Sequence, residues 1–212
     1  MEEIINLKII EKIYWLRDEI ISNINSESVD VYLWLKNEYG KGNVNKNLVF
    51  QFTFRSYYRL DSAGLTEKQK GRFFELMTDK KVNLEKILEE LYKLPTLREK
   101  KTIQFSFATK LLHTINNNKP IFDSEVAAII HRKVSGNNKK SKIESCREIY
   151  SFLEDLYFIL VKEKKIKKVI SKFRSRFDIA QNQITDIKIL DFIIWSLGRL
   201  ERNKVRKNLR KR

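Results

Sequence analysis

The sequence predicts an all-α protein. Apolar residues recur at the 3.6-residue spacing of amphipathic helices along most of the chain, and helix-capping patterns precede several of these stretches. The 212 residues include only six glycines and two prolines, which are few turn-forming residues for a sheet protein rich in tight turns. We therefore expect helices in more than half of the chain and no sheet of three or more strands.

Helical spacing and capping residues define the elements of the first half. Isoleucines and leucines predict an opening helix that ends at about Asn23, and Gly40 closes the second helix. Thr66 and Gln69 form a capping box, and Asn83 caps the helix that follows. The expected helices here cover residues 4–23, 29–39, 66–77 and 84–94, and a central helical hairpin follows over 97–115.

The aromatic stretch over residues 48–60 is ambiguous. Phe50, Phe52 and Phe54 alternate with polar or small residues as they would in a strand. We interpret this stretch as a helix, because predicted helices flank it on both sides and a lone strand has no partner with which to pair.

In the second half, polar residues again mark where helices begin. Asp123 opens one helix, Ser141 and Glu144 form a second capping box, and Thr185 or Asp186 caps the last apolar helix. The first expected helix runs from Asp123 through Ile130 and ends at the Gly136-Asn-Asn turn, and a long helix follows from Ser141 to about Lys164. A basic segment continues from there to Phe177, and the last helix holds the apolar residues from Ile189 to Leu197. With no repeat or linker, we expect a single domain over residues 1–200 and a basic C-terminal tail over 201–212.

Cysteine content and hydropathy exclude several classes of protein. The single cysteine, Cys146, excludes an internal disulfide, a four-cysteine zinc site and a cysteine-ligated iron–sulfur cluster. No apolar run approaches the length that spans a bilayer, and the chain begins Met-Glu-Glu rather than with a basic leader. We expect a cytoplasmic protein with no membrane span.

The charge predicts a polyanionic partner. Lysine and arginine total 43 against 27 acidic residues, a formal net charge of +16. Basic residues concentrate at 162–176, with eight Lys or Arg and one acid, and at 201–212, with seven and one. Such a field attracts nucleic acid by counterion release and long-range steering. An acidic membrane surface or simple solubility are the alternatives.

Lys110 and Asp123 lie on either side of a polar turn that contains Asn116-Asn-Asn118. A primary amine and a carboxylate are the two functional groups that imine formation at a sugar carbon requires. The plain alternatives are that Lys110 is one solvated lysine among many and that Asp123 only caps a helix.

The run Phe105-Ser-Phe-Ala-Thr-Lys110-Leu-Leu, the polar turn and then Pro120-Ile-Phe-Asp123-Ser-Glu-Val126 resemble the core of the helix-hairpin-helix DNA glycosylases, in particular the 8-oxoguanine glycosylase and endonuclease III branch. The resemblance implies an all-helical fold and a hydrolase that excises bases from DNA in repair or defence, with or without abasic-site lyase activity. It further implies that Lys110 is the nucleophile and that Asp123 assists it.

The chain departs from the family at the hairpin. Ser106 and Ala108 stand where the family has glycines, and Phe105 replaces its usual proline. The segment from Lys110 to Asp123 is also shorter than its counterpart. A non-catalytic nucleic-acid-binding or accessory protein is therefore the alternative to an enzyme, and a protein adaptor with a basic tail is a third reading.

The candidate site residues follow from the resemblance and from the two basic clusters. We expect catalysis by Lys110 and Asp123, no metal, and no cofactor. His113 and His131 match no metal-binding spacing, and the tryptophans and Cys146 are expected in the core. The predicted contacts to nucleic acid, with DNA favoured over RNA, are Ser106, Lys164, Lys165, Lys167, Lys168, Lys172, Arg174, Arg176, Arg206, Lys207 and Arg210.

Overall fold

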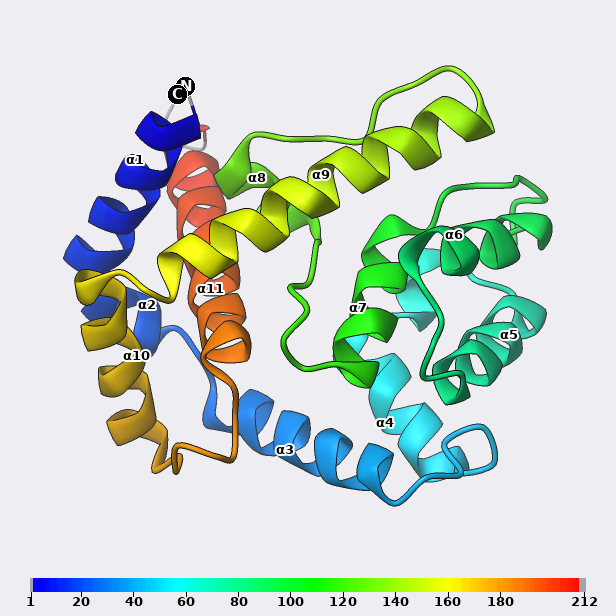
Figure 1. Cartoon of the computed structure of the whole chain (residues 1–212), viewed down its shortest axis with the longest axis horizontal. Coiled ribbons are helices and arrows are strands. Elements are labelled where there is room, and N and C mark those ends of the chain that lie inside the picture. The colour runs from blue at the N-terminus through cyan, green and yellow to red at the C-terminus, as the bar shows by residue number, and fades with distance from the viewer. Residues whose placement is uncertain (1, 210–212) are drawn as a thin grey trace. The chain divides into compact units, whose positions relative to one another are not determined.

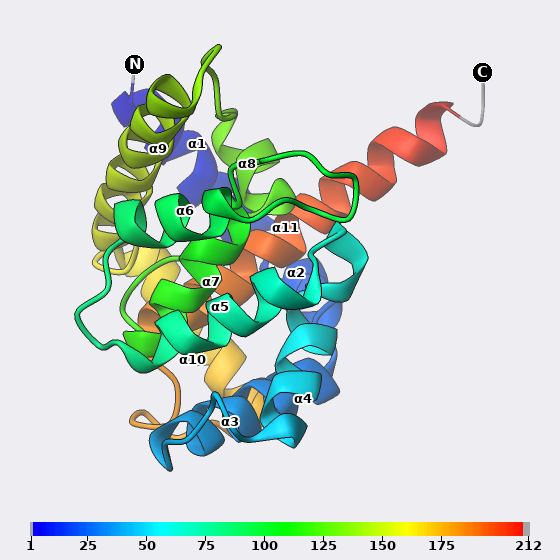
Figure 2. The ribbon, with the colours of Figure 1, turned by 90° about the vertical axis from the view of Figure 1, so that its right-hand side faces the viewer.

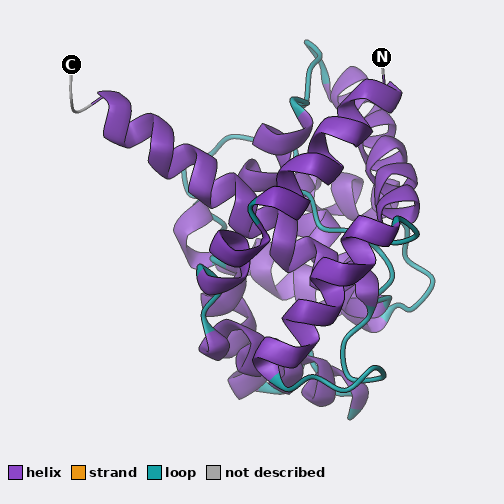
Figure 3. Cartoon of the chain, turned by 90° about the vertical axis from the view of Figure 1, so that its left-hand side faces the viewer, coloured by secondary structure: helices purple, strands orange, loops and turns teal. Residues whose placement is uncertain are grey.

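The protein is all-α, as the sequence predicts. The computed structural model describes the backbone of residues 2–209 and the side chains of residues 6–206. Figure 3 shows helices joined by loops, and no strand occurs in residues 2–209. The elements along the chain are α1 (Glu2–Trp15), α2 (Arg17–Ser22), α3 (Ser26–Gly40), α4 (Leu48–Tyr58), the short 3-10 helix η1 (Asp61–Ala63), α5 (Glu67–Thr78), α6 (Leu84–Lys93), α7 (Phe105–Ile115), α8 (Ser124–Ile130), α9 (Lys139–Leu160), α10 (Lys164–Phe177) and α11 (Asp186–Leu209).

The helices belong to two compact units (Figure 1). The terminal unit comprises Met1–Ser26, Pro120–Lys133 and Ser151–Arg212, and the central unit comprises Glu27–Lys119 and Val134–Tyr150. Helix α9 contributes to both. The single domain expected over residues 1–200 stays a prediction, because a compact unit need not fold by itself.

Helix α11 organises the terminal unit. It packs against α1, α2, α8 and α10, and its Ile189, Leu190, Ile193 and Leu197 are fully buried. In Figure 2 the end of α11 extends away from α1. Residues 201–209 continue this helix, so the described part of the expected basic tail is helical.

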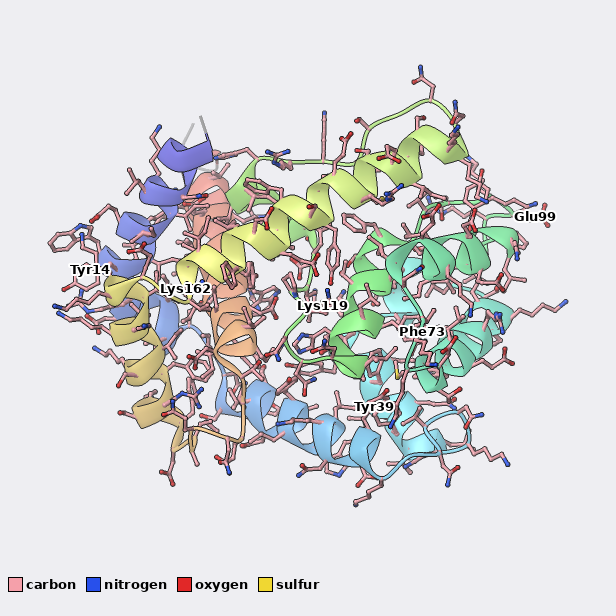
Figure 4. The ribbon with its side chains drawn as sticks, viewed as in Figure 1. Tyr14, Tyr39, Phe73, Glu99, Lys119 and Lys162 are labelled. Carbon is pink, nitrogen blue, oxygen red and sulfur yellow. The ribbon has the colours of Figure 1, made fainter. Side chains whose placement is uncertain are left out.

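An aromatic core fills the central unit, where α5, α6 and α7 pack against one another. Phe50 and Phe54 are fully buried, and their rings contact that of Phe74. Phe52, by contrast, is 64% exposed. Residues four apart share one helix face whereas a residue two positions away points elsewhere, so this burial pattern is the signature of a helix. Phe73 lies among these helices in Figure 4.

Several helix starts follow the predicted capping. The Thr66 side chain accepts from the Gln69 amide and the Gln69 side chain accepts from the Thr66 amide, which completes the capping box of α5. Asn83 caps α6, and the Thr185 hydroxyl accepts from the Lys188 amide at the start of α11.

Other boundaries were predicted wrongly. The region predicted as a central hairpin contains only one helix, α7. Residues 97–104 form a loop instead, in which the amide and the hydroxyl of Thr96 both donate to the Lys100 carbonyl. The helix predicted from Ser141 begins earlier, since Asn138 accepts from the Ser141 amide and acts as the cap. Helix α8 ends at Ile130, where His131 adopts a left-handed conformation with φ 53°.

Candidate functional site

Helix α10 is the basic element of the terminal unit. Ile166, Val169, Ile170 and Phe173 are buried, because they recur at three- and four-residue spacing on one side of the helix. The lysines and arginines lie at other positions of the helix. Figure 1 shows α10 beside α1, the helix with which it packs.

Three of the predicted contact residues on α10 are engaged by acids within the unit. Lys165 donates to Glu11, and Lys172 donates to Asp18. The hydrogen bond from Lys165 is the largest influence that lowers the pKa of the Glu11 carboxyl. The carboxylates of Glu11 and Asp18 therefore partly neutralise these two lysines in the protein itself.

Arg174 is the third engaged residue. Its guanidinium lies 2.7 Å from Asp186 Oδ1 and donates to the carbonyls of Ala180 at 3.0 Å and Ile184 at 2.8 Å. These contacts fix the loop between α10 and α11, so Arg174 has a structural role.

Four other predicted residues on α10 form no salt bridge to any described residue. Lys164, Lys167, Lys168 and Arg176 are all exposed. Lys164 and Lys167 lie in the first turn of α10, where the helix dipole disfavours cations by about 0.3–1 kcal/mol each. Helix stability alone therefore does not explain their placement.

The second basic cluster takes part in packing within the terminal unit. Arg202 Nη2 lies 2.7 Å from Glu125 Oε2, and Lys204 Nζ lies 3.6 Å from Glu19 Oε2. Arg206 is exposed and forms no salt bridge to the described part of the chain. Of the other predicted contacts, Arg210 lies outside the described residues, and Lys207 lies on α11 where only the backbone is described.

Lys110 lies on α7 in the central unit. Its Nζ is 3.4 Å from the carbonyl oxygen of Tyr58, 5.0 Å from the ring centroid of Phe107 and 5.8 Å from that of Tyr58. Both rings are 8% exposed, so they belong to the core of the unit. The ammonium group thus lies beside a carbonyl and two aromatic faces, contacts that favour a cation. Ser106, predicted to contact phosphate, lies in the first turn of the same helix.

Asp123 lies in the terminal unit and caps α8. Its Oδ1 accepts from the backbone amides of Glu125 at 2.9 Å and Val126 at 3.0 Å. The predicted capping role is confirmed. Because Lys110 and Asp123 belong to different units, their meeting in one catalytic site stays a prediction.

Sequence reasoning missed the residues that hold the first turn of α8. A Cβ atom on Gly198 of α11 would lie 2.7 Å from the Glu125 carbonyl oxygen, so only glycine permits this approach. Arg202 pairs with the Glu125 carboxylate and donates to Ser124 Oγ at 3.1 Å. Burial raises the pKa of Glu125, and Arg202 partly opposes that effect. The one available signal was Gly198 itself, a glycine directly after Leu197, the last apolar residue of the predicted final helix.

The histidine His113 has a packing role in the central unit. It is fully buried, its Nδ1 lies 2.7 Å from the Lys119 carbonyl, and its Nε2 lies 3.1 Å from the Tyr32 hydroxyl. A carbonyl only accepts, so Nδ1 carries the proton and Nε2 accepts from Tyr32. Within the described residues, no three histidine, cysteine or acidic side chains are placed to share a metal ion.

Comparison of the chain with models of protein families, with curated proteins and with solved structures gave no match. No helix among residues 2–209 combines the length and apolar character needed to cross a membrane.

Proposed function

We propose that this chain binds nucleic acid, with DNA the expected partner, through the exposed face of α10. The proposal depends on four exposed cations that form no salt bridge to a described residue, namely Lys164, Lys167, Lys168 and Arg176. Cations that are not neutralised within the protein release the most counterions when they contact phosphates.

The test replaces these four residues together with glutamine. The matched control replaces Lys46, Lys68, Lys80 and Lys101, four exposed lysines of the central unit that form no salt bridge to a described residue. Both variants lose four charges, so a general effect of net charge is the same in each. We expect the α10 variant to bind labelled DNA much more weakly than the control variant. Equal affinities would contradict the proposal.

A second candidate function is base excision at Lys110. What supports it is the position of the amine, which is held against the Tyr58 carbonyl and the faces of two aromatic rings. Because these contacts favour the ammonium form, a base must take a proton from the amine before it attacks. In this reaction the neutral amine attacks the sugar carbon C1′ and the base leaves with its bonding electron pair. The attacking nitrogen gives up a proton to the departing base, and its lone pair then breaks the C1′–O4′ bond. O4′ takes a proton from water, and a protonated imine remains at C1′. Loss of a C2′ proton would release the 3′ phosphate.

Borohydride reduction tests the imine. A lesion-containing or abasic DNA should be trapped as a covalent adduct by the wild-type protein and not by Lys110→Gln, which removes one of 43 basic charges and should leave DNA binding nearly unchanged. Asp123→Asn should slow trapping. If the wild-type protein traps no abasic DNA and excises no base from a panel of lesions, the enzymatic proposal fails and the non-catalytic binding protein remains.

A further inference from the structure

The surface beside α10 also carries solvent-exposed aromatic rings. Trp15, the last residue of α1, is 71% exposed, and Phe158, near the end of α9, is 59% exposed. Isolated exposed apolar residues are common on proteins. These two differ because Lys162 lies over the Phe158 ring, and because Glu11, which accepts from Trp15, also accepts from Lys165 of α10.

The Trp15 ring is held by its neighbours. Its Nε1 donates to Glu11 Oε2 at 3.1 Å, and Glu11 in turn accepts from Lys165. The Tyr14 ring meets Trp15 edge to face, with centroids 5.6 Å apart. A ring that is already oriented loses little conformational entropy when a ligand stacks on it.

Cations also lie over Phe158 and over Tyr14, the ring that contacts Trp15. The Arg17 guanidinium carbon lies 5.0 Å and Lys165 Nζ 5.4 Å from the Tyr14 centroid, whereas Lys162 Nζ lies 3.2 Å from the Phe158 centroid. Figure 4 shows Tyr14 at the outer edge of α1 and Lys162 at the turn before α10. Lysines thus lie beside two aromatic rings in this part of the terminal unit.

We infer that this surface binds single-stranded DNA, with unpaired bases stacked on Trp15 and Phe158 and phosphates on Lys164, Lys167 and Lys168. Aromatic platforms that follow a basic groove are the usual means of holding a single strand. Bases in a duplex stack on each other, so surface rings do not reach their faces. The inference rests on the proposed function and deepens it, because it names the form of DNA that is bound.

The experiment compares Trp15→Ala with wild type in binding a labelled oligothymidine of roughly 20 nucleotides, long enough to cover one site, and a duplex of the same length. Each stacked base contributes roughly 1–3 kcal/mol, so we expect single-strand affinity to fall roughly 5- to 150-fold while duplex affinity changes little. Trp15→Phe keeps a ring and should restore most of the single-strand affinity. Phe52→Ala is the matched control, since Phe52 is similarly exposed but lies on α4 of the central unit.

The outcomes separate the two proposals. If both nucleic acids bind in a salt-dependent manner and Trp15→Ala behaves like Phe52→Ala, the stacking inference is overturned and the proposed function stands. If the wild-type protein binds neither nucleic acid, the proposed function itself fails. Tighter binding of an oligouridine of the same length would overturn the assignment to DNA. Helical circular dichroism of each variant checks that the fold is intact.

Discussion

At the scale of single residues, Asp123 has a defined structural role. One carboxylate oxygen satisfies two amides in the first turn of α8, which would otherwise lack acceptors. Asparagine keeps an oxygen in that position, whereas alanine does not. Stability measurements on the two substitutions therefore separate capping from the proposed chemistry.

We expect Asp123→Ala to lower the free energy of unfolding by about 1 kcal/mol and Asp123→Asn to lower it by only a few tenths. Urea denaturation of both variants measures the difference. If the asparagine variant is destabilised as strongly as the alanine variant, the negative charge rather than the capping oxygen supports the helix.

Cys146 is fully buried in α9, and burial raises the pKa of its thiol to about 12. An unfolded cysteine has a pKa of about 8.5, so as the pH rises the unfolded chain loses this proton before the folded protein does. The stabilisation from the protonated thiol is complete below about pH 8.5 and is lost between there and pH 12. Relative to Cys146→Ala, the wild-type protein should therefore lose stability over that range. Denaturation curves at several pH values check this, and a pH-independent difference would contradict it.

At the scale of elements, the packing of α8 on α11 depends on a glycine. The Cβ of an alanine at position 198 would meet the Glu125 carbonyl oxygen at 2.7 Å and the Glu125 Cβ at 2.8 Å. Neither atom belongs to the flexible end of a side chain, so the two helices would have to separate.

We expect Gly198→Ala to destabilise the protein by about 1–3 kcal/mol. Gly71→Ala is the control, because Gly71 lies on α5 with no atom within 4 Å of the added Cβ. There the better helix propensity of alanine should stabilise by up to about 1 kcal/mol. Denaturation midpoints of the two variants should move in opposite directions, and a shift of both in the same direction would refute the packing argument.

Helix types and many starts were predictable because the signals are local. The Thr66 capping box, the Asn83 cap and the Asp123 cap each depend on residues within one turn. The stretch at 97–104 was mistaken for helix because its loop is closed by Thr96 and Lys100, whose pairing carries no sequence signature. At Ser141, Asn138 three residues earlier supplies the competing cap.

At the scale of the whole molecule, the charge predicted a basic surface but not which cations are available on it. Lys165 and Lys172 are partnered by Glu11 and Asp18, each 154 residues away in the chain. Pairings over such separations depend on tertiary structure, so the sequence alone does not show which of these lysines have an acidic partner. Trp15 was expected in the core but is exposed. Helical spacing shows which residues share a face of α1, but it does not show whether another element covers that face.

The salt dependence of DNA affinity tests the role of α10 most directly. For the wild-type protein, the logarithm of the association constant should fall linearly with the logarithm of salt concentration, by roughly 0.9 for each phosphate contact on duplex DNA or 0.7 on a single strand. Replacement of Lys164, Lys167, Lys168 and Arg176 by glutamine should flatten this slope, whereas replacement of Lys46, Lys68, Lys80 and Lys101 should leave it unchanged. An unchanged slope in the α10 variant would contradict the central claim and place the phosphate contacts elsewhere on the protein.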